Sequence, residues 1–252
     1  MLKNKIILVS GACGLLGREI VREITDNNGY VLATDINTDK AEKLFHALMP
    51  ERVQFATMDI TNVDSIDLAI ANGKKQFGSV DACVNAAYPR TGNWGNTFEE
   101  LEMGDIQENL KLQLGGAIIL SQRMMKNFIS QGHGNFIHMS SIFGIAAPKF
   151  DHYEGTSMTS TIEYSAIKSG IISMTRWLAK YYKNKNIRVN CVSPGGILDQ
   201  QPQSFLDKYK NSCTSKGMLD PIDILGTIMF LLSDQSKYIN GQNIIVDDGW
   251  SL

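Results

Sequence analysis

The chain has 252 residues, of which 43% are hydrophobic and 20% are charged, and its formal net charge is −2 at pH 7. These values are ordinary for a compact globular protein and exclude the classes with unusual composition. The near-neutral charge gives no overall positive field, so we expect neither nucleic acid nor a membrane surface as a partner.

Cysteine spacing indicates neither a metal site nor a disulfide framework. The four cysteines stand far apart without a CxxC or Cys/His cluster, at Cys13, Cys83, Cys191 and Cys213. Lys3 and Lys5 before the apolar stretch 6–17 resemble the start of a signal peptide, but three glycines interrupt that stretch and no small-residue cleavage site follows it. We therefore expect reduced thiols, no metal and a cytoplasmic protein.

Short apolar runs rich in β-branched residues alternate with segments of helical period along the chain. The runs predict seven strands, at residues 6–9, 30–33, 53–55, 80–84, 135–138, 187–191 and 243–246. The periodic segments predict helices that include residues 15–24, 41–49, 63–77 and 162–182. Because continuous apolar runs are typical of strands covered on both faces, the pattern predicts a doubly wound α/β domain with one parallel sheet.

Two stretches lack a clear period, residues 144–160 and 193–220. In open α/β sheets ligands bind beyond the carboxyl ends of the strands, and both stretches follow such ends. No linker, charge block or repeat divides the chain. We therefore expect a single domain over residues 1–252, with these two stretches as its substrate loops.

The first predicted strand runs into a glycine-rich turn at residues 10–17, Ser-Gly-Ala-Cys-Gly-Leu-Leu-Gly. Its glycines permit a tight turn, close approach of backbone N–H groups to a pyrophosphate, and packing of helix against strand. The helix that follows adds partial positive charge at its first turn. An ordinary glycine turn is the alternative, but the position between first strand and first helix favours a dinucleotide site. The cofactor residues expected there are Ser10, Gly11, Gly14, Leu15, Leu16 and Gly17.

Asp35 stands at the end of the second predicted strand, near the expected separation from Gly11 for a carboxylate that binds the adenosine ribose. A helix cap is the alternative. Ile36 and Asn37 follow, so no arginine is adjacent to receive a 2′-phosphate, and the carboxylate would repel one. The pattern predicts NAD rather than NADP, with Ile36 part of the site. The next two strand ends offer further cofactor contacts, or simply turn residues, at Asp59, Ile60, Asn85, Ala86 and Ala87.

Tyr164 and Lys168 lie four residues apart on a predicted helix, so their side chains share one face. An ammonium beside a phenol, together with the positive charge of a nicotinamide, would lower the tyrosine pKa and suit the pair to proton transfer. Tyr181 and Lys185 have the same spacing further along the helix. Ser141, at the end of the fifth predicted strand, favours the first pair, because the start of the helix can return to that strand end.

In this order the motifs resemble the short-chain dehydrogenases/reductases over nearly the whole chain. The matching segments are residues 10–17, Asp35, Asn85-Ala86-Ala87, Ser141, Tyr164-x-x-x-Lys168, Ser193-Pro194-Gly195 and the tail from Asn240 to Gly249. The resemblance implies a Rossmann-type fold, hydride transfer at a nicotinamide, and a homodimer or homotetramer. It implies that Ser141 orients the substrate, that Tyr164 is the acid/base, and that Lys168 lowers its pKa and holds the ribose. Further cofactor contacts are implied at Pro194, Gly195 and Ile197.

Two departures from the family pattern concern the glycine turn and the fourth helix. The glycine spacing looks like that of the extended branch with epimerases and dehydratases, but the short remainder after Pro194 favours the single-domain branch. The family's helix-four asparagine aligns with Gln113 when the helix is matched through Ser121-Gln122. Asn109 looks like the family's Asn-Leu dipeptide but is out of register, and either amide could instead brace a loop. We prefer Gln113 as the fourth catalytic residue.

A third departure is an insert between Ser141 and Tyr164. Its residues 147–155 are polar and aromatic and are expected over the active-site mouth, although a solvated loop is the alternative. A functional interpretation makes five side chains substrate contacts: Arg90, Trp94, Lys149, His152 and Tyr153. The segments around the insert look like oxidoreductases of bacterial nonulosonate and flagellin-glycan biosynthesis, which suggests a sugar by analogy.

The sequence therefore predicts an NAD(H)-dependent oxidoreductase that interconverts an alcohol and a ketone on a sugar or its phosphorylated or nucleotide-linked form. One alternative is a dehydratase or epimerase that recycles its NAD, suggested by the glycine spacing and opposed by the length. The other is a catalytically weak NAD-binding scaffold in glycan assembly, suggested by Gln113. The complete Ser141, Tyr164 and Lys168 set weighs against the scaffold.

Overall fold

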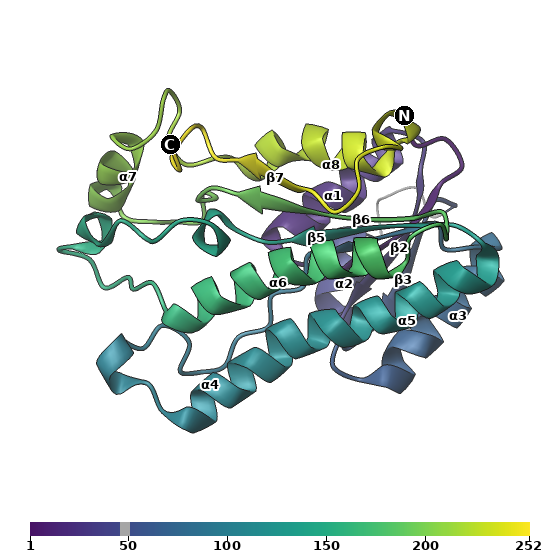
Figure 1. The fold of residues 1–252 in the computed structure, drawn as a ribbon, viewed down its shortest axis with the longest axis horizontal. Coiled ribbons are helices and arrows are strands. Elements are labelled where there is room, and N and C mark those ends of the chain that lie inside the picture. The colour runs from purple at the N-terminus through teal and green to yellow at the C-terminus, as the bar shows by residue number, and fades with distance from the viewer. Residues whose placement is uncertain (46–50) are drawn as a thin grey trace.

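A single parallel sheet runs through the protein, with helices on both of its faces (Figure 1). The computed structural model describes residues 1–45 and 51–252. Its seven strands are β1 (Ile6–Ser10), β2 (Tyr30–Asp35), β3 (Val53–Thr57), β4 (Ala82–Asn85), β5 (Gly134–Met139), β6 (Ile187–Pro194) and β7 (Asn243–Val246). They are hydrogen-bonded in the order β3-β2-β1-β4-β5-β6-β7. The predicted doubly wound, Rossmann-type sheet is confirmed.

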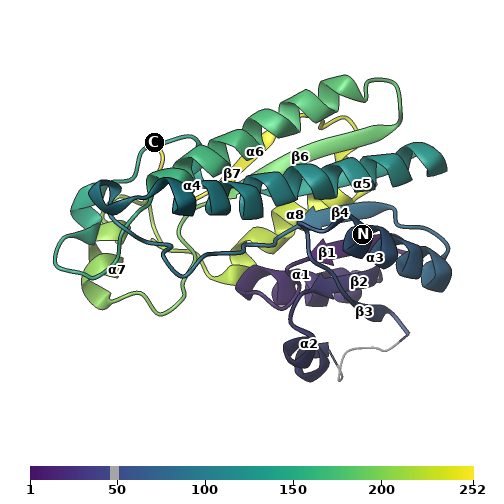
Figure 2. The same ribbon diagram turned by 90° about the horizontal axis from the view of Figure 1, so that it is seen from below.

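Helices cover this sheet from both sides. In the described residues they are α1 (Leu15–Asp26), α2 (Thr38–Phe45), α3 (Val63–Phe77), α4 (Met103–Leu110), α5 (Gly116–Gln131), α6 (Ile162–Tyr181), α7 (Gln203–Lys210) and α8 (Leu225–Leu232). Helices α1, α2 and α8 pack on one face, and α3, α5 and α6 on the other (Figures 1 and 2). The predicted helix over 41–49 corresponds to α2, and its last residues lie outside the described part. No helix in the described ranges is both long enough and apolar enough to cross a bilayer.

Alternate side chains of a strand point to opposite faces of the sheet and pack into two different hydrophobic clusters. In β1, Ile7 and Val9 pack into the cluster under α1 and α8, while Leu8 packs into the cluster under α3 and α5. All three side chains have no exposed surface. Because side chains alternate across a pleated strand, a strand between two helical layers must be apolar at every position, as the continuous runs indicated.

The prediction that residues 193–220 lack regular structure was wrong in part. Strand β6 extends to Pro194, and α7 forms within the stretch. This helix is short and carries only Phe205 and Tyr209 as buried residues, so its period is too brief to stand out in the sequence. Both side chains join a third apolar cluster that also contains Trp250 from the C-terminal tail.

The strand order places the binding crevice. Strand β1 lies between β2 and β4. From β1 the chain builds β2 and β3 on one side, and it then crosses back to build β4 and the later strands on the other side. Crossover connections separate at this point, and in open α/β sheets ligands bind there, beyond the carboxyl ends of the strands. The residues that follow β1, β2, β4, β5 and β6 are therefore brought to a single edge.

Candidate active site

The glycine turn after β1 is packed too tightly for side chains. Gly11 has a φ of +69°, and a Cβ there would lie 2.7 Å from the backbone of Ala87, just after β4. A Cβ on Gly17 would lie 2.0 Å from the carbonyl oxygen of Gly11, so α1 can approach the turn only with glycine at that position. Gly14 precedes α1, whose first turn contains no acidic residue. The N–H groups and positive end of α1 therefore fit the pyrophosphate of a dinucleotide.

Two polar side chains tie the strand ends around this turn. The Asp35 carboxylate accepts hydrogen bonds from the backbone N–H groups of Cys13, at 2.9 Å, and Asn37, at 3.1 Å. The Ser10 hydroxyl donates to the side-chain oxygen of Asn85 at 2.7 Å, which joins β1 to β4. Asp35 thus braces the glycine turn and also places negative charge beside it, where a 2′-phosphate would be repelled.

The flanking residues predicted for the cofactor divide into accessible and buried ones. Ile36 is 69% exposed beside Asp35 and is free to contact an adenine ring. Asp59 is exposed, with one carboxylate oxygen held by the N–H and hydroxyl of Thr61. Ile60 is buried, and a Cβ on Gly116 of α5 would meet it at 2.9 Å. Ile60 therefore shapes the wall behind the crevice rather than its surface.

Ser141, Tyr164 and Lys168 are brought together where β5 ends and α6 begins. The Thr161 hydroxyl caps α6 by accepting the N–H of Tyr164, at 3.4 Å. The Lys168 ammonium donates to the carbonyl of Met139 at 3.1 Å and lies 5.4 Å from the centre of the Tyr164 ring. The Ser141 hydroxyl is close enough to Tyr164 for a hydrogen bond that lowers the phenol's pKa. The first Tyr/Lys pair thus adjoins the strand-end serine.

The protein groups alone do not produce the lowered tyrosine pKa that the sequence predicted. Burial raises the pKa of Tyr164, and the hydrogen bond with Ser141 opposes this only in part. Burial also lowers the pKa of Lys168 to about 8, because an ammonium loses hydration there. Tyr164 is therefore held as the neutral phenol, while Lys168 stays an ammonium below about pH 8, and added positive charge at the site would favour the phenolate.

Helix α4 continues through a π-helical turn (Lys111–Gly115) into α5, and this turn carries Gln113. The side-chain amide of Asn109 donates to Glu163 on α6 at 3.4 Å. Gln113 is 5% exposed, and neither of its amide atoms has a hydrogen-bond partner among the described residues. Asn109 is thus engaged in a helix–helix contact, whereas the amide of Gln113 remains available to a water or ligand.

The insert is tied to the rest of the protein by side chains that were predicted to contact substrate. The Lys149 ammonium donates to the carbonyl of Trp250 at 3.3 Å and lies 4.7 Å from the centre of its indole ring. His152 is 2% exposed and lies 3.0 Å from the Ser212 hydroxyl. Tyr153 packs edge-on against Phe205 of α7. These contacts engage Lys149 and His152 inside the protein.

An aromatic cluster surrounds Tyr164, and sequence reasoning missed two of its members. The ring centres of Tyr88, Trp94 and Phe143 lie 5.7, 6.0 and 6.2 Å from that of Tyr164. The Arg90 guanidinium lies 5.2 Å from the centre of the Tyr88 ring, at the rim of the cluster. Tyr88 and Phe143 directly follow the strand-end motifs at residues 85–87 and 141–142, and that position was the available signal.

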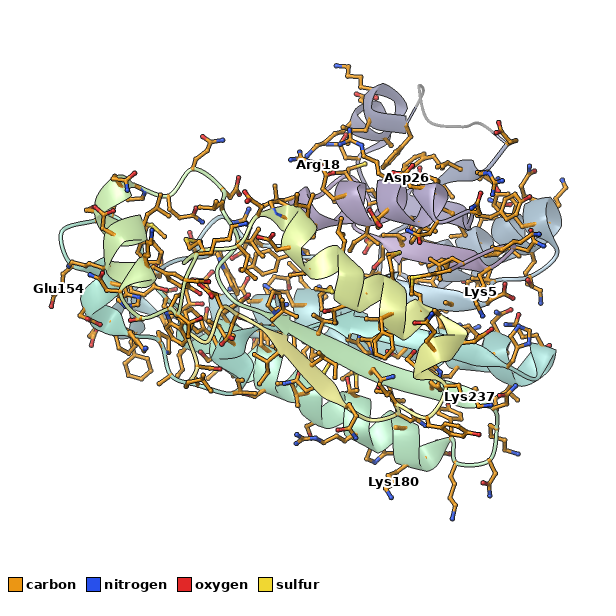
Figure 3. All side chains as sticks on the ribbon, turned by 90° about the horizontal axis from the view of Figure 1, so that it is seen from above. Lys5, Arg18, Asp26, Glu154, Lys180 and Lys237 are labelled. Carbon is orange, nitrogen blue, oxygen red and sulfur yellow. The ribbon has the colours of Figure 1, made fainter. Side chains whose placement is uncertain are left out.

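The opposite end of the sheet contains a cavity of about 1000 Å³ with no part in this site. Its lining includes Lys5, Lys180 and Lys237, which Figure 3 shows far from Glu154 at the insert. Tyr181, on the last turn of α6, is 66% exposed and stacks on Trp177 at 4.6 Å. Tyr181 is thus a surface residue at the opposite end of α6 from Tyr164.

A doubly wound sheet whose edge joins a glycine turn to a Ser–Tyr–Lys group defines a dinucleotide-dependent oxidoreductase. Residues 11–251 match the enoyl-(acyl carrier protein) reductase family model adh_short_C2. A post-translational flagellin modification protein A from Campylobacter coli is 46% identical over 256 residues, covering 100% of both chains. A 7alpha-hydroxysteroid dehydrogenase from Bacteroides fragilis is 31% identical, covering 99% of this chain and 95% of the relative. The protein belongs to the short-chain dehydrogenase/reductase family.

A solved structure agrees with this assignment. A short-chain dehydrogenase from Leptospira borgpetersenii, with bound NAD+, superposes with a TM-score of 0.88 and is 28% identical. The match covers 100% of this chain and 94% of the other. The fold is thus shared over the full length of this chain with a dehydrogenase that binds NAD+.

Proposed function

We propose that the protein is an NAD(H)-dependent oxidoreductase that interconverts an alcohol and a ketone on a sugar or a phosphorylated or nucleotide-linked sugar. The observation that carries this proposal is the meeting of the glycine turn, Asp35 and the Ser141–Tyr164–Lys168 group at one sheet edge. NAD+ in the Leptospira structure supports the cofactor. The flagellin-modification name of the Campylobacter relative supports a sugar.

The side chains divide the chemistry among them. In the oxidation direction the Tyr164 phenolate oxygen takes the proton of the substrate alcohol and becomes the phenol, and the Ser141 hydroxyl donates a hydrogen bond to the same substrate oxygen. Lys168 supplies the positive charge that favours the phenolate over the phenol. Bound NAD would supply the hydride acceptor for the oxidation, and bound NADH would supply the hydride donor for the reverse reaction. The Gly11–Gly17 turn, Asp35 and the chain after β6 at Pro194, Gly195 and Ile197 would hold the cofactor.

Gln113 is proposed to hold a water beside Lys168. Its amide is buried on the π-helical turn and has a free donor and a free acceptor. A buried amide in this state requires partners, and a water can satisfy both of its atoms. The proton leaving Tyr164 could then reach solvent through that water. Gln113 is preferred to Asn109 in our proposal because both of its amide atoms lack a partner in the part of the chain that the structure describes, whereas the amide nitrogen of Asn109 donates to Glu163.

The walls above Tyr164 suit a ring-shaped polar substrate. Trp94 and Tyr88 present aromatic surface that fits the C–H face of a pyranose, and Arg90 at the rim suits a phosphate. Tyr153, which packs edge-on against Phe205, is proposed as a further substrate contact. Lys149 and His152 would act on the substrate only indirectly, by holding the insert in place.

We also propose a homodimer or homotetramer in the cytoplasm. Apolar side chains remain exposed on the two neighbouring helices α5 and α6, including Ile118 at 48%, Ile129 at 44% and Trp177 at 59%. An exposed apolar surface of this kind is typical of contacts between subunits. Size-exclusion chromatography with light scattering would measure the assembly directly.

The test is NADH formation with a panel of sugars, sugar phosphates and nucleotide sugars. We expect turnover by the wild type and a loss of about 100-fold or more in Tyr164→Phe, the contribution typical of acid/base catalysis. NADH binding should be retained in that variant, and Tyr181→Phe is the matched control. Unchanged turnover in Tyr164→Phe would refute the mechanism. A product that has lost water without net NADH would support the dehydratase, and NAD binding without turnover the scaffold.

A further inference from the structure

Two tyrosine rings, not one, face the Lys168 ammonium. Its Nζ atom lies 5.4 Å from the ring centre of Tyr164 and also 5.4 Å from that of Tyr88. Tyr88 directly follows Asn85-Ala86-Ala87 after β4, so it reaches the ammonium from a different strand end. Lys168 itself is only 7% exposed. Its surroundings are therefore set by side chains rather than by bulk water.

We propose that Tyr88 is a positioning residue that holds the Lys168 ammonium beside Tyr164. This role rests on the function proposed above but concerns a side chain outside the Ser–Tyr–Lys group. The face of an aromatic ring attracts a cation within about 6 Å of its centre, and the attraction is stronger where water is excluded. Tyr88 thus stabilises the charged form of Lys168 in a site where burial destabilises it.

An aromatic ring suits this position better than a carboxylate would. An ammonium has three N–H donors, and Lys168 uses one of them on the Met139 carbonyl. A carboxylate would take further donors and neutralise the charge that the Tyr164 phenolate needs. The Tyr88 ring stabilises the cation without taking a hydrogen bond. The remaining donors stay available to a ribose hydroxyl and to a water held by Gln113.

Tyr88 is itself held in place from two sides. Trp94 packs edge-on against it at 5.7 Å, close enough for its indole to oppose the rise that burial causes in the Tyr88 pKa. Tyr164 packs edge-on from the other side, also at 5.7 Å. The ring is 41% exposed, so it forms the boundary between Lys168 and the open mouth of the site. Loss of the ring would remove the cation partner of Lys168, while an apolar side chain of similar size at this position would still exclude water.

The ionisable tyrosines and the histidine near Lys168 do not titrate near pH 8, so they do not obscure the titration of Lys168. Tyr164 and Tyr88 both have raised pKa values because of burial. His138 on β5 has its pKa lowered to about 3 by burial and by the charge of Lys168, so it is neutral near pH 8. Arg90 lies across the Tyr88 ring, with its guanidinium 5.2 Å from the ring centre. A change in protonation near pH 8 therefore reports on Lys168.

The experiment measures how the acylation of Lys168 by trace acetic anhydride depends on pH, with peptide mass spectrometry and without any substrate. Tyr88→Phe keeps the ring and loses the hydroxyl, so we expect the midpoint of the wild type. Tyr88→Leu loses the ring, and we expect a midpoint lower by about 0.5 pH unit. Circular dichroism and NADH fluorescence establish that each variant is folded and binds cofactor.

The outcomes separate this proposal from the proposed function. A folded Tyr88→Leu protein with an unchanged or raised midpoint overturns the positioning role, whatever the enzyme turns over. If Tyr88→Leu does not fold, Tyr88→Met provides the same comparison, with the same lowered midpoint expected and an unchanged one again overturning the role. Absence of turnover in the wild type overturns the proposed function and leaves the measured midpoints as they are.

Discussion

The two halves of the active site are built in different ways. The cofactor half consists of backbone turns at strand ends, where glycines at 11 and 17 meet neighbouring backbone at distances that no side chain tolerates. The substrate half consists of side chains from distant segments, such as Lys149 against Trp250 and His152 beside Ser212. Local steric demands therefore determine the first half, and long-range packing determines the second.

This difference explains which half can be deduced from a sequence. A backbone approach that excludes Cβ atoms requires glycine, so it leaves a short motif with fixed spacing. A packed aromatic cluster requires only apolar volume, which many residues at many separations supply. We therefore expect single substitutions in the cofactor half to be severe and those in the substrate half to be graded.

The largest effect is expected from Gly17→Ala. The new Cβ would lie 2.0 Å from the Gly11 carbonyl oxygen and 2.8 Å from Ala12 Cα, so α1 must move away from the turn. We expect a loss of about 3 kcal/mol in the free energy of unfolding, measured by urea denaturation, and loss of NADH binding. Gly226→Ala in α8 is the control, because a Cβ there meets no atom within 4 Å. If Gly17→Ala bound NADH with wild-type affinity, the cofactor half would not depend on close backbone packing, and this difference between the two halves would not hold.

A second prediction concerns the buried charge of Lys168. Its pKa is lowered from 10.5 to about 8, so the folded state disfavours the ammonium. This cost is fully present below pH 8 and disappears as the pH rises from 8 to 10.5, where the unfolded chain binds more protons. We expect Lys168→Met to raise the free energy of unfolding by up to about 3 kcal/mol at pH 7 while abolishing turnover.

The pH dependence provides the check on this prediction. The difference in stability between wild type and Lys168→Met should shrink between pH 8 and pH 10, because only the wild type gains stability there. A constant difference across that range would contradict the assignment of the effect to the buried ammonium. If Lys168→Met is more stable than the wild type but inactive, then Lys168, where the two halves meet, is kept for function at a cost in stability.

The fold, including the position of the glycine turn between β1 and α1, was largely predictable from the sequence, and the physical reason is periodicity. The run that predicted β1 is apolar at four successive positions, Ile-Ile-Leu-Val, because both faces of the strand are covered, and few other structures impose that pattern. Asp35 was predictable because it ends a strand at a set distance from the turn. Helix α7 was not, because two buried residues make no period. The choice between Asn109 and Gln113 needed the partner Glu163, which lies far along the chain.

A third prediction tests the charge of Asp35. Asp35→Asn removes the repulsion of a 2′-phosphate but keeps an oxygen that can accept from Cys13, so the glycine turn should persist. We expect the ratio of NADPH to NADH affinity to rise by about tenfold, which corresponds to about 1.4 kcal/mol. Fluorescence titration with both cofactors measures the ratio. An unchanged ratio would show that Asp35 only braces the turn and does not select the cofactor.

The smallest effect is expected in the substrate half, from Lys149→Met. The variant loses the contact with the Trp250 ring and one hydrogen bond to its carbonyl, so we expect a loss of about 1 kcal/mol in stability. Lys183→Met, an exposed lysine remote from the insert, is the control and should change stability little. Because the ammonium faces Trp250, we expect KM to change less than threefold. A tenfold rise in KM with unchanged stability would instead assign Lys149 to the substrate, and the contrast between the two halves would then fail at this residue.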